Sequence, residues 1–77
     1  MRTDLVITEA LQAQKRYGPF RSTHEAYGVL CEEVSELLFA IRENNIDSIR
    51  HEALQVAAVA LRLANEDDVE FLARSVK

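Results

Sequence analysis

The apolar residues recur at helical spacing along almost the whole chain. In the first stretch, one helical face carries Val6, Ala10, Ala13 and Tyr17. Gly18 and Pro19 follow, and this pair is typical of a helix end, because Gly favours the C-terminal cap and Pro cannot continue the helix. The pattern therefore predicts a first helix from about Asp4 to Tyr17.

A second helix is predicted from Ser22 to about Glu43. Ser22 and Glu25 stand three positions apart, as in a capping box, in which each residue satisfies a free backbone N–H of the other. Asn44 and Asn45 end the apolar pattern. The expected core face of this helix carries Tyr27, Leu30, Val34, Leu37, Leu38 and Ile41.

The third predicted helix begins between Asn45 and Asp47 and ends near Asn65. Between Ala53 and Ala64 it is apolar on almost every face, and such a helix must be covered on all sides. The acidic residues after Asn65 are typical of a helix start and predict a short fourth helix to about Val76.

These elements predict an all-α fold: a single domain, residues 1–77, built as a small bundle of three to four helices. So few helices cannot cover the third one completely. A stripe of small residues on it permits close helix approach: Ala53, Ala57, Ala60 and Ala64. We therefore expect a homodimer or homotetramer, in which a second chain completes a four-helix-type bundle.

Composition narrows the class of protein. The chain has 48% hydrophobic and 29% charged residues and only three Gly or Pro, which argues against disorder and against a β-sandwich. Its net charge of −4 argues against a nucleic-acid partner. The longest wholly apolar run, Val56–Leu61, is far below the ~20 residues of a membrane span. With no signal-peptide pattern at its start, we expect a cytoplasmic protein without membrane contact.

The single cysteine, Cys31, excludes an internal disulfide and a cysteine-rich zinc site. Because it falls in the apolar pattern of the second helix, we expect a buried, unreactive thiol.

Three carboxylates stand among apolar neighbours. Glu33 and Glu36 border the apolar stripe of the second helix, and Glu52 continues an apolar row of the third helix, with Gln55 one turn later. A buried carboxylate is costly unless it is paired or binds a metal. Antiparallel packing of the two helices would bring these three carboxylates and one amide oxygen together.

Several oxygen ligands without a Cys or His partner suit Mg²⁺ or Mn²⁺ and not zinc. A di-iron bundle would need Glu-x-x-His on two helices, and that pattern is absent from the sequence. The alternative is an ion pair of Glu33 or Glu52 with Arg50, Arg62 or an arginine of a partner chain. Spacing alone does not decide between a metal and an ion pair.

The segments 32–36 (Glu-Glu-Val-Ser-Glu) and 52–55 (Glu-Ala-Leu-Gln) resemble the E-E-x-x-E … E-x-x-D signature of the MazG-type all-α nucleoside triphosphate pyrophosphohydrolases. The resemblance covers about residues 5–65. It implies a Mg²⁺-dependent enzyme that cleaves (d)NTPs to nucleoside monophosphate and pyrophosphate in nucleotide-pool house-cleaning.

Under this resemblance, Glu33, Glu36 and Glu52 match the metal-ligand positions. Gln55 stands where the family has Asp, so it would offer a carbonyl oxygen but one negative charge fewer, and Mg²⁺ would bind less firmly. Glu32 matches the leading acid of the signature. Either Glu32 or Glu36 would orient the attacking water as the catalytic residue.

Three basic residues near the loop before the second helix are candidates for binding the triphosphate: Lys15, Arg16 and Arg21. An ordinary solvated role, with favourable charge at a helix C-terminus, explains them equally well. A second functional hypothesis is a non-catalytic helical module that binds nucleotides or protein partners, and Gln55 favours it. A helix-turn-helix DNA binder has little support, because the second helix is acidic.

Overall fold

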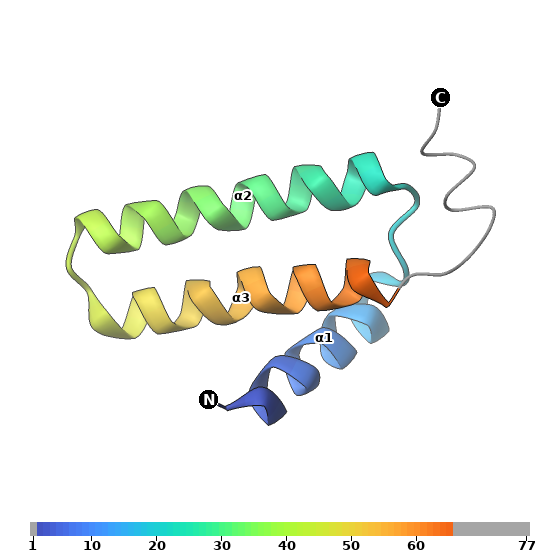
Figure 1. Ribbon diagram of the computed structural model, residues 1–77, viewed down its shortest axis with the longest axis horizontal. Helices are drawn as coiled ribbons and strands as arrows, with labels where there is room; N and C mark the ends of the chain where they lie inside the picture. The colour runs from blue at the N-terminus through green and yellow to red at the C-terminus, as the bar shows by residue number, and fades with distance from the viewer. Residues whose placement is uncertain (1, 66–77) are drawn as a thin grey trace.

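A computed structural model describes residues 2–65, which form three α-helices and, over that span, no strand. The helices are α1 (Thr3–Tyr17), α2 (Thr23–Arg42) and α3 (Ile46–Ala64) (Figure 1). The predicted all-α fold is therefore confirmed. The predicted fourth helix lies outside the described residues. None of these three helices combines the length and the apolar character that crossing a membrane requires.

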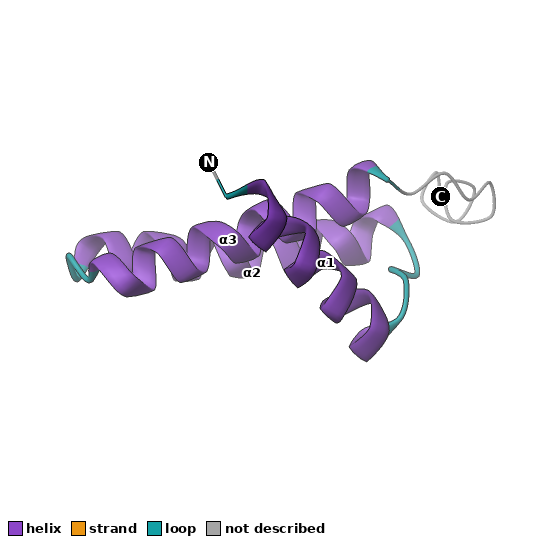
Figure 2. Cartoon of the chain, turned by 90° about the horizontal axis from the view of Figure 1, so that it is seen from below, coloured by secondary structure: helices purple, strands orange, loops and turns teal. Residues whose placement is uncertain are grey.

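Helix α3 is the centre of the fold. It runs antiparallel to α2, side by side along most of its length, and α1 packs obliquely across its other side (Figures 1 and 2). As predicted, one chain does not cover α3 completely, because Ala53, Ala60 and Ala64 are exposed in the single chain. The alanine stripe therefore takes little part in packing within one chain.

Side-chain caps set the starts of α2 and α3. Ser22 Oγ accepts a hydrogen bond from the backbone N–H of Glu25 at 3.1 Å, as the capping-box pattern predicts. The return bond is displaced by one residue, since Glu25 Oε1 accepts from the backbone N–H of Arg21 at 3.1 Å. At the start of α3, Asn45 Oδ1 accepts from the backbone N–H of Ser48 at 3.1 Å.

The turn between α2 and α3 is a Schellman motif. Asn44 adopts the left-handed region with a φ of 54°, which Asn tolerates better than most residues. Its N–H donates to the carbonyl of Ile41 at 3.1 Å, and the N–H of Asn45 donates to the carbonyl of Ala40 at 3.3 Å. Asn45 therefore closes α2 with its backbone and starts α3 with its side chain, which makes the connection short and fixed.

The core is small and rich in alanine. Its buried members are Ala10, Phe20, Ala26, Ala40, Ala58 and Val59. Phe20, Ala26 and Val59 form one cluster, against which three half-buried residues pack: Val29, Leu30 and Leu63. Because Ala26 and Ala40 carry short side chains, α2 lies close to α3.

The predicted core face of α2 is partly wrong. Leu30 and Leu37 are half-buried as expected, but a second group is exposed by about half or more in the single chain: Tyr27, Val34, Leu38 and Ile41. The physical reason is that α2 is apolar over more than half of its circumference, and α3 covers only the side marked by Ala26 and Ala40. The thiol of Cys31 is also exposed, contrary to the prediction of a buried one.

Candidate metal centre

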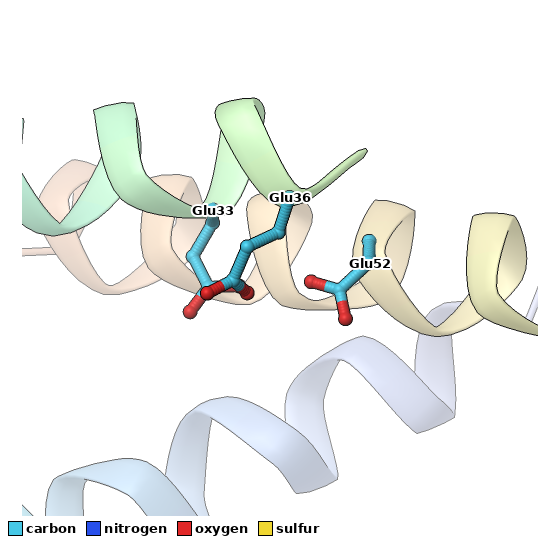
Figure 3. A group of neighbouring side chains, drawn as sticks. All are labelled: Glu33, Glu36 and Glu52. Atoms are coloured by element: carbon cyan, nitrogen blue, oxygen red, sulfur yellow. The ribbon is translucent and has the colours of Figure 1, made fainter. Parts of the chain in front are cut away.

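Glu33 and Glu36 of α2 and Glu52 of α3 converge on one point. One carboxylate oxygen from each lies within 4.8 Å of those of the other two (Figure 3). The structure thus brings together the three carboxylates that the sequence singled out. No other such group of metal-binding side chains occurs in residues 2–65.

Helical geometry and the turn explain the convergence. Glu33 and Glu36 are three residues apart and share a face of α2. Glu36 lies eight residues before Asn44 and Glu52 lies eight residues after it. In an antiparallel hairpin folded at Asn44, these two positions are therefore level with each other.

Two of the carboxylates are half-buried and incompletely satisfied. Glu33 Oε2 and Glu52 Oε2 are shielded from solvent and have no hydrogen-bond partner within the described part of the chain. A shielded carboxylate oxygen without a partner costs free energy. The cluster therefore favours the arrival of a cation or of protons.

Glu33 carries the electrostatic strain of the cluster. Its pKa is raised from 4.5 to about 7, first by burial and then by the negative charges of Glu36 and Glu52. Near neutral pH the side chain is thus divided between its protonated and ionised forms. A divalent cation would oppose both effects and lower the pKa of Glu33, because it stabilises all three carboxylates in the ionised form.

The alternative of an ion pair with an arginine of the same chain is not realised within residues 2–65. No arginine or lysine nitrogen lies within 4.0 Å of a carboxylate oxygen of Glu33 or Glu52. The nearest basic group to Glu52 is the neighbouring His51, whose Nε2 is 3.8 Å away and whose side chain is largely exposed. Arg62 is bonded elsewhere, to Gln14 and to the carbonyl of Gly18.

Two hollows flank the carboxylates. The first, which we call the three-helix cavity, measures about 400 Å³ and lies between α1, α2, α3 and the loop from Gly18 to Phe20. Glu33 and Gln55 line it. The second hollow measures about 410 Å³, lies near the α2–α3 turn, and is lined by Glu36 and Glu52. Glu33 thus borders one hollow, and Glu36 and Glu52 border the other.

The remaining predicted site residues separate into two groups. Glu32 and Arg16 line the three-helix cavity together with Gln55. Lys15 and Arg21 are exposed and line neither hollow, and Arg21 Nε lies 3.9 Å from Glu25 Oε2.

Arg62 lines the same cavity, although the sequence pattern suggested it only as an ion-pair partner. The sequence does contain a signal for this position of Arg62. Its spacing of seven residues from Gln55 and ten from Glu52 places all three on one face of α3.

The donor set fits a hard divalent cation. Three carboxylates are ligands that Mg²⁺ and Mn²⁺ accept, and Gln55, which lines the three-helix cavity with Glu33, follows Glu52 by three residues on α3. The main support for this fit is that Glu33 and Glu52 each have a shielded oxygen without a hydrogen-bond partner in the described chain.

Among known proteins, no family model, no curated protein and no solved structure matches this chain. What the site can do must therefore be argued from its own geometry and from the resemblance of its two short segments to the MazG-type signature.

Proposed function

We propose that this protein is a Mg²⁺-dependent nucleoside triphosphate pyrophosphohydrolase. It would cleave a (d)NTP to the monophosphate and pyrophosphate, as a cytoplasmic house-cleaning enzyme of the nucleotide pool. The observation that carries the proposal is the convergence of Glu33, Glu36 and Glu52 within 4.8 Å, with two shielded oxygens that lack partners.

Each residue has a role in this proposal. Glu33, Glu36 and Glu52 hold the metal, and the carbonyl oxygen of Gln55 takes the fourth ligand position. A bound Mg²⁺ supplies neutralisation of the phosphate charge. Glu32 borders the same cavity as Glu33 and is placed to hold a water by hydrogen bonding. Glu36 is the alternative for that task.

The three-helix cavity is the proposed substrate pocket. Its lining includes apolar side chains such as Val29 and Val59, which limit water, and also Arg16. In this proposal Arg16 binds a phosphate of the substrate, and Lys15 and Arg21 add long-range attraction from outside the pocket.

The proposed active form is a homodimer or homotetramer without a nucleic-acid partner. The support comes from the exposed side of α2. Its uncharged residues follow a 4-3-4-3 spacing, which is the spacing of a coiled-coil interface: Tyr27, Cys31, Val34, Leu38 and Ile41. A second chain on this face would bury what one chain leaves exposed.

The direct test is incubation with Mg²⁺ and a panel of ribo- and deoxyribonucleoside triphosphates, followed by separation of monophosphate and pyrophosphate. We expect both products in equal amounts and none in EDTA. Release of inorganic phosphate in place of pyrophosphate would contradict the reaction type. No product from any nucleotide, with no stabilisation by metal, would refute the proposal.

A second function belongs to a different class: a non-catalytic helical module that binds nucleotides or protein partners. Gln55 favours it, because a neutral amide at this position lowers the charge of the metal site. Binding of Mg²⁺ and nucleotide without turnover is its expected signature.

A further inference from the structure

Arg62 lines the three-helix cavity together with Glu33, whereas Glu36 and Glu52 line the second hollow. Glu52 and Arg62 share one helical face and are ten residues apart, which corresponds to about 15 Å along the helix axis. Glu33 and Arg62 both line the three-helix cavity. A ligand in that cavity therefore has the carboxylate of Glu33 beside it at one place and a guanidinium at another. Three further acidic residues line the cavity as well: Glu9, Glu25 and Glu32.

The guanidinium of Arg62 is held in a fixed position. Its Nε donates to Gln14 Oε1 at 3.2 Å, and its Nη2 donates to the carbonyl of Gly18 at 3.0 Å. Its central carbon lies 4.1 Å from the centre of the Phe20 ring, which is itself buried. Three contacts from α1 and the following loop thus orient one α3 side chain.

None of these contacts neutralises the charge. Both hydrogen-bond acceptors are neutral groups, and no carboxylate oxygen in residues 2–65 lies within 4.0 Å of the Arg62 nitrogens. Burial lowers the pKa of Arg62, and the more distant Glu25 opposes this, but an arginine stays charged in a protein. Glu25 already accepts from the backbone of Arg21.

Such a group is suited to receive an anion. A half-buried cation gains free energy from a charged partner, and the planar guanidinium matches the oxygens of a phosphate. Arg62 has N–H donors left after its two hydrogen bonds. Because its position is already fixed, binding an anion costs little side-chain entropy.

We propose that Arg62, in addition to Arg16, recognises phosphate in the three-helix cavity and that it binds the pyrophosphate end of the substrate. This inference rests on the proposed function and deepens it, since it makes Arg62 the residue that distinguishes a triphosphate from a monophosphate. Arg62 and the carboxylate cluster, through the Mg²⁺ that the cluster would hold, then act on different parts of one polyphosphate.

The test uses inorganic pyrophosphate as the probe, titrated calorimetrically into the full chain with saturating Mg²⁺. We expect Arg62→Gln to weaken pyrophosphate binding by roughly tenfold or more, because a charge-assisted hydrogen bond is lost. Arg62→Lys retains the charge, and its pyrophosphate affinity should lie between those of the parent and Arg62→Gln. The matched control is Arg42→Gln, an exposed arginine of α2 that lines neither hollow.

Two further measurements distinguish phosphate recognition by Arg62 from a purely structural role. Since the Arg62→Gln substitution could loosen the loop, stabilisation by Mg²⁺ is measured in parallel, and we expect it to persist in the variant. In the unaltered protein, the Nε–H resonance of Arg62 should shift on addition of pyrophosphate, a readout that needs no variant to fold. An unshifted resonance, or unchanged pyrophosphate affinity in a folded Arg62→Gln, would overturn the inference.

Nucleotide turnover separates this inference from the proposed function. If pyrophosphate binding depends on Arg62 but no nucleotide is hydrolysed, the proposed enzymatic function is refuted and the anion site at Arg62 is supported. If Arg62→Gln hydrolyses nucleotide with the same KM as the parent, the proposed role of Arg62 is refuted and the enzymatic function is supported.

Discussion

Glu33 and Glu52 belong to antiparallel helices, yet each directs a carboxylate group into the same small volume, and each keeps one shielded oxygen without a hydrogen-bond partner in the described chain. Two such groups repel each other and Glu36. Without a cation the protein is therefore under electrostatic strain at this point, which a proton on Glu33 or a bound cation would relieve.

Replacing Glu52 by Gln preserves the shape of the side chain and removes one of the three charges. We expect Mg²⁺ affinity to fall about tenfold or more, because affinity follows the charge of the ligands. Without metal, the variant should be more stable than the parent by about 1–2 kcal/mol at pH 8, since repulsion is reduced. Isothermal titration and urea unfolding measure the two effects.

The control for this variant is Asp47→Asn, an exposed acid in the first turn of α3 that lines neither hollow. It should leave Mg²⁺ affinity unchanged and cost about 0.3–1 kcal/mol through the helix dipole. Equal metal affinity in Glu52→Gln and the parent would exclude the carboxylate cluster as the metal site.

The raised pKa of Glu33 makes stability depend on pH. The pKa is about 7 in the folded chain and 4.5 as its ordinary value, so between these pH values the folded state binds more protons than the unfolded state. The free energy of unfolding of the metal-free protein should therefore fall as pH rises from about 4.5 to 7 and then level off. Metal binding, which requires the ionised form, should strengthen over the same range.

Urea unfolding in EDTA across this pH range measures the effect, and Glu33→Gln isolates it from other titrating groups. The variant should lose the part of the pH dependence that belongs to Glu33. If the two proteins lose stability in parallel between these pH values, the pKa of Glu33 is not raised.

The exposed apolar face of α2 predicts self-association. Leu38 is 47% exposed in the single chain, and Leu38→Lys would bury a charge in the proposed interface. We expect sedimentation at micromolar concentration to show a dimer or tetramer for the parent and a lower mass, with reduced helicity, for the variant. Gln12→Lys adds the same charge at an exposed polar position of α1 and should not change the mass. A monomeric parent would contradict the proposed assembly.

Gln55→Asp restores the negative charge that the MazG-type signature has at this position. In an enzyme it should raise Mg²⁺ affinity and turnover by up to about tenfold, because the fourth ligand becomes anionic. In a non-catalytic module, turnover should stay at zero while metal affinity rises. Gln55→Asn, which shortens the side chain without adding charge, is the control and should not increase either quantity.

The boundaries of the helices were predictable because local chemistry sets them. The Ser22 and Asn45 caps and the Gly18–Pro19 stop act through hydrogen bonds and dihedral angles within a few residues. The meeting of Glu33, Glu36 and Glu52 was predictable for the same reason, since two regular helices joined by a short turn leave little freedom.

Which side of α2 meets α3 was not predictable from periodicity. Leu30 and Val34 fit the same apolar pattern, and the choice between their two sides depends on how closely the helix backbones approach at Ala26 and Ala40. The contacts that orient Arg62 were hidden for a similar reason. Its hydrogen bonds to Gln14 and Gly18 span 48 and 44 residues of sequence, and no local pattern reports them.

The turn at Asn44 sets the relative positions of the carboxylates on α2 and α3. Glu36 and Glu52 are equidistant from it in sequence, so the length of the turn decides whether they face each other. One residue inserted within α3 before Glu52 would rotate Glu52 by about 100° around the helix axis and move it by about 1.5 Å relative to α2. All three helices could then persist while the carboxylates no longer meet. The proposed capacity to bind a cation thus depends on the hairpin geometry as much as on the acidic residues themselves.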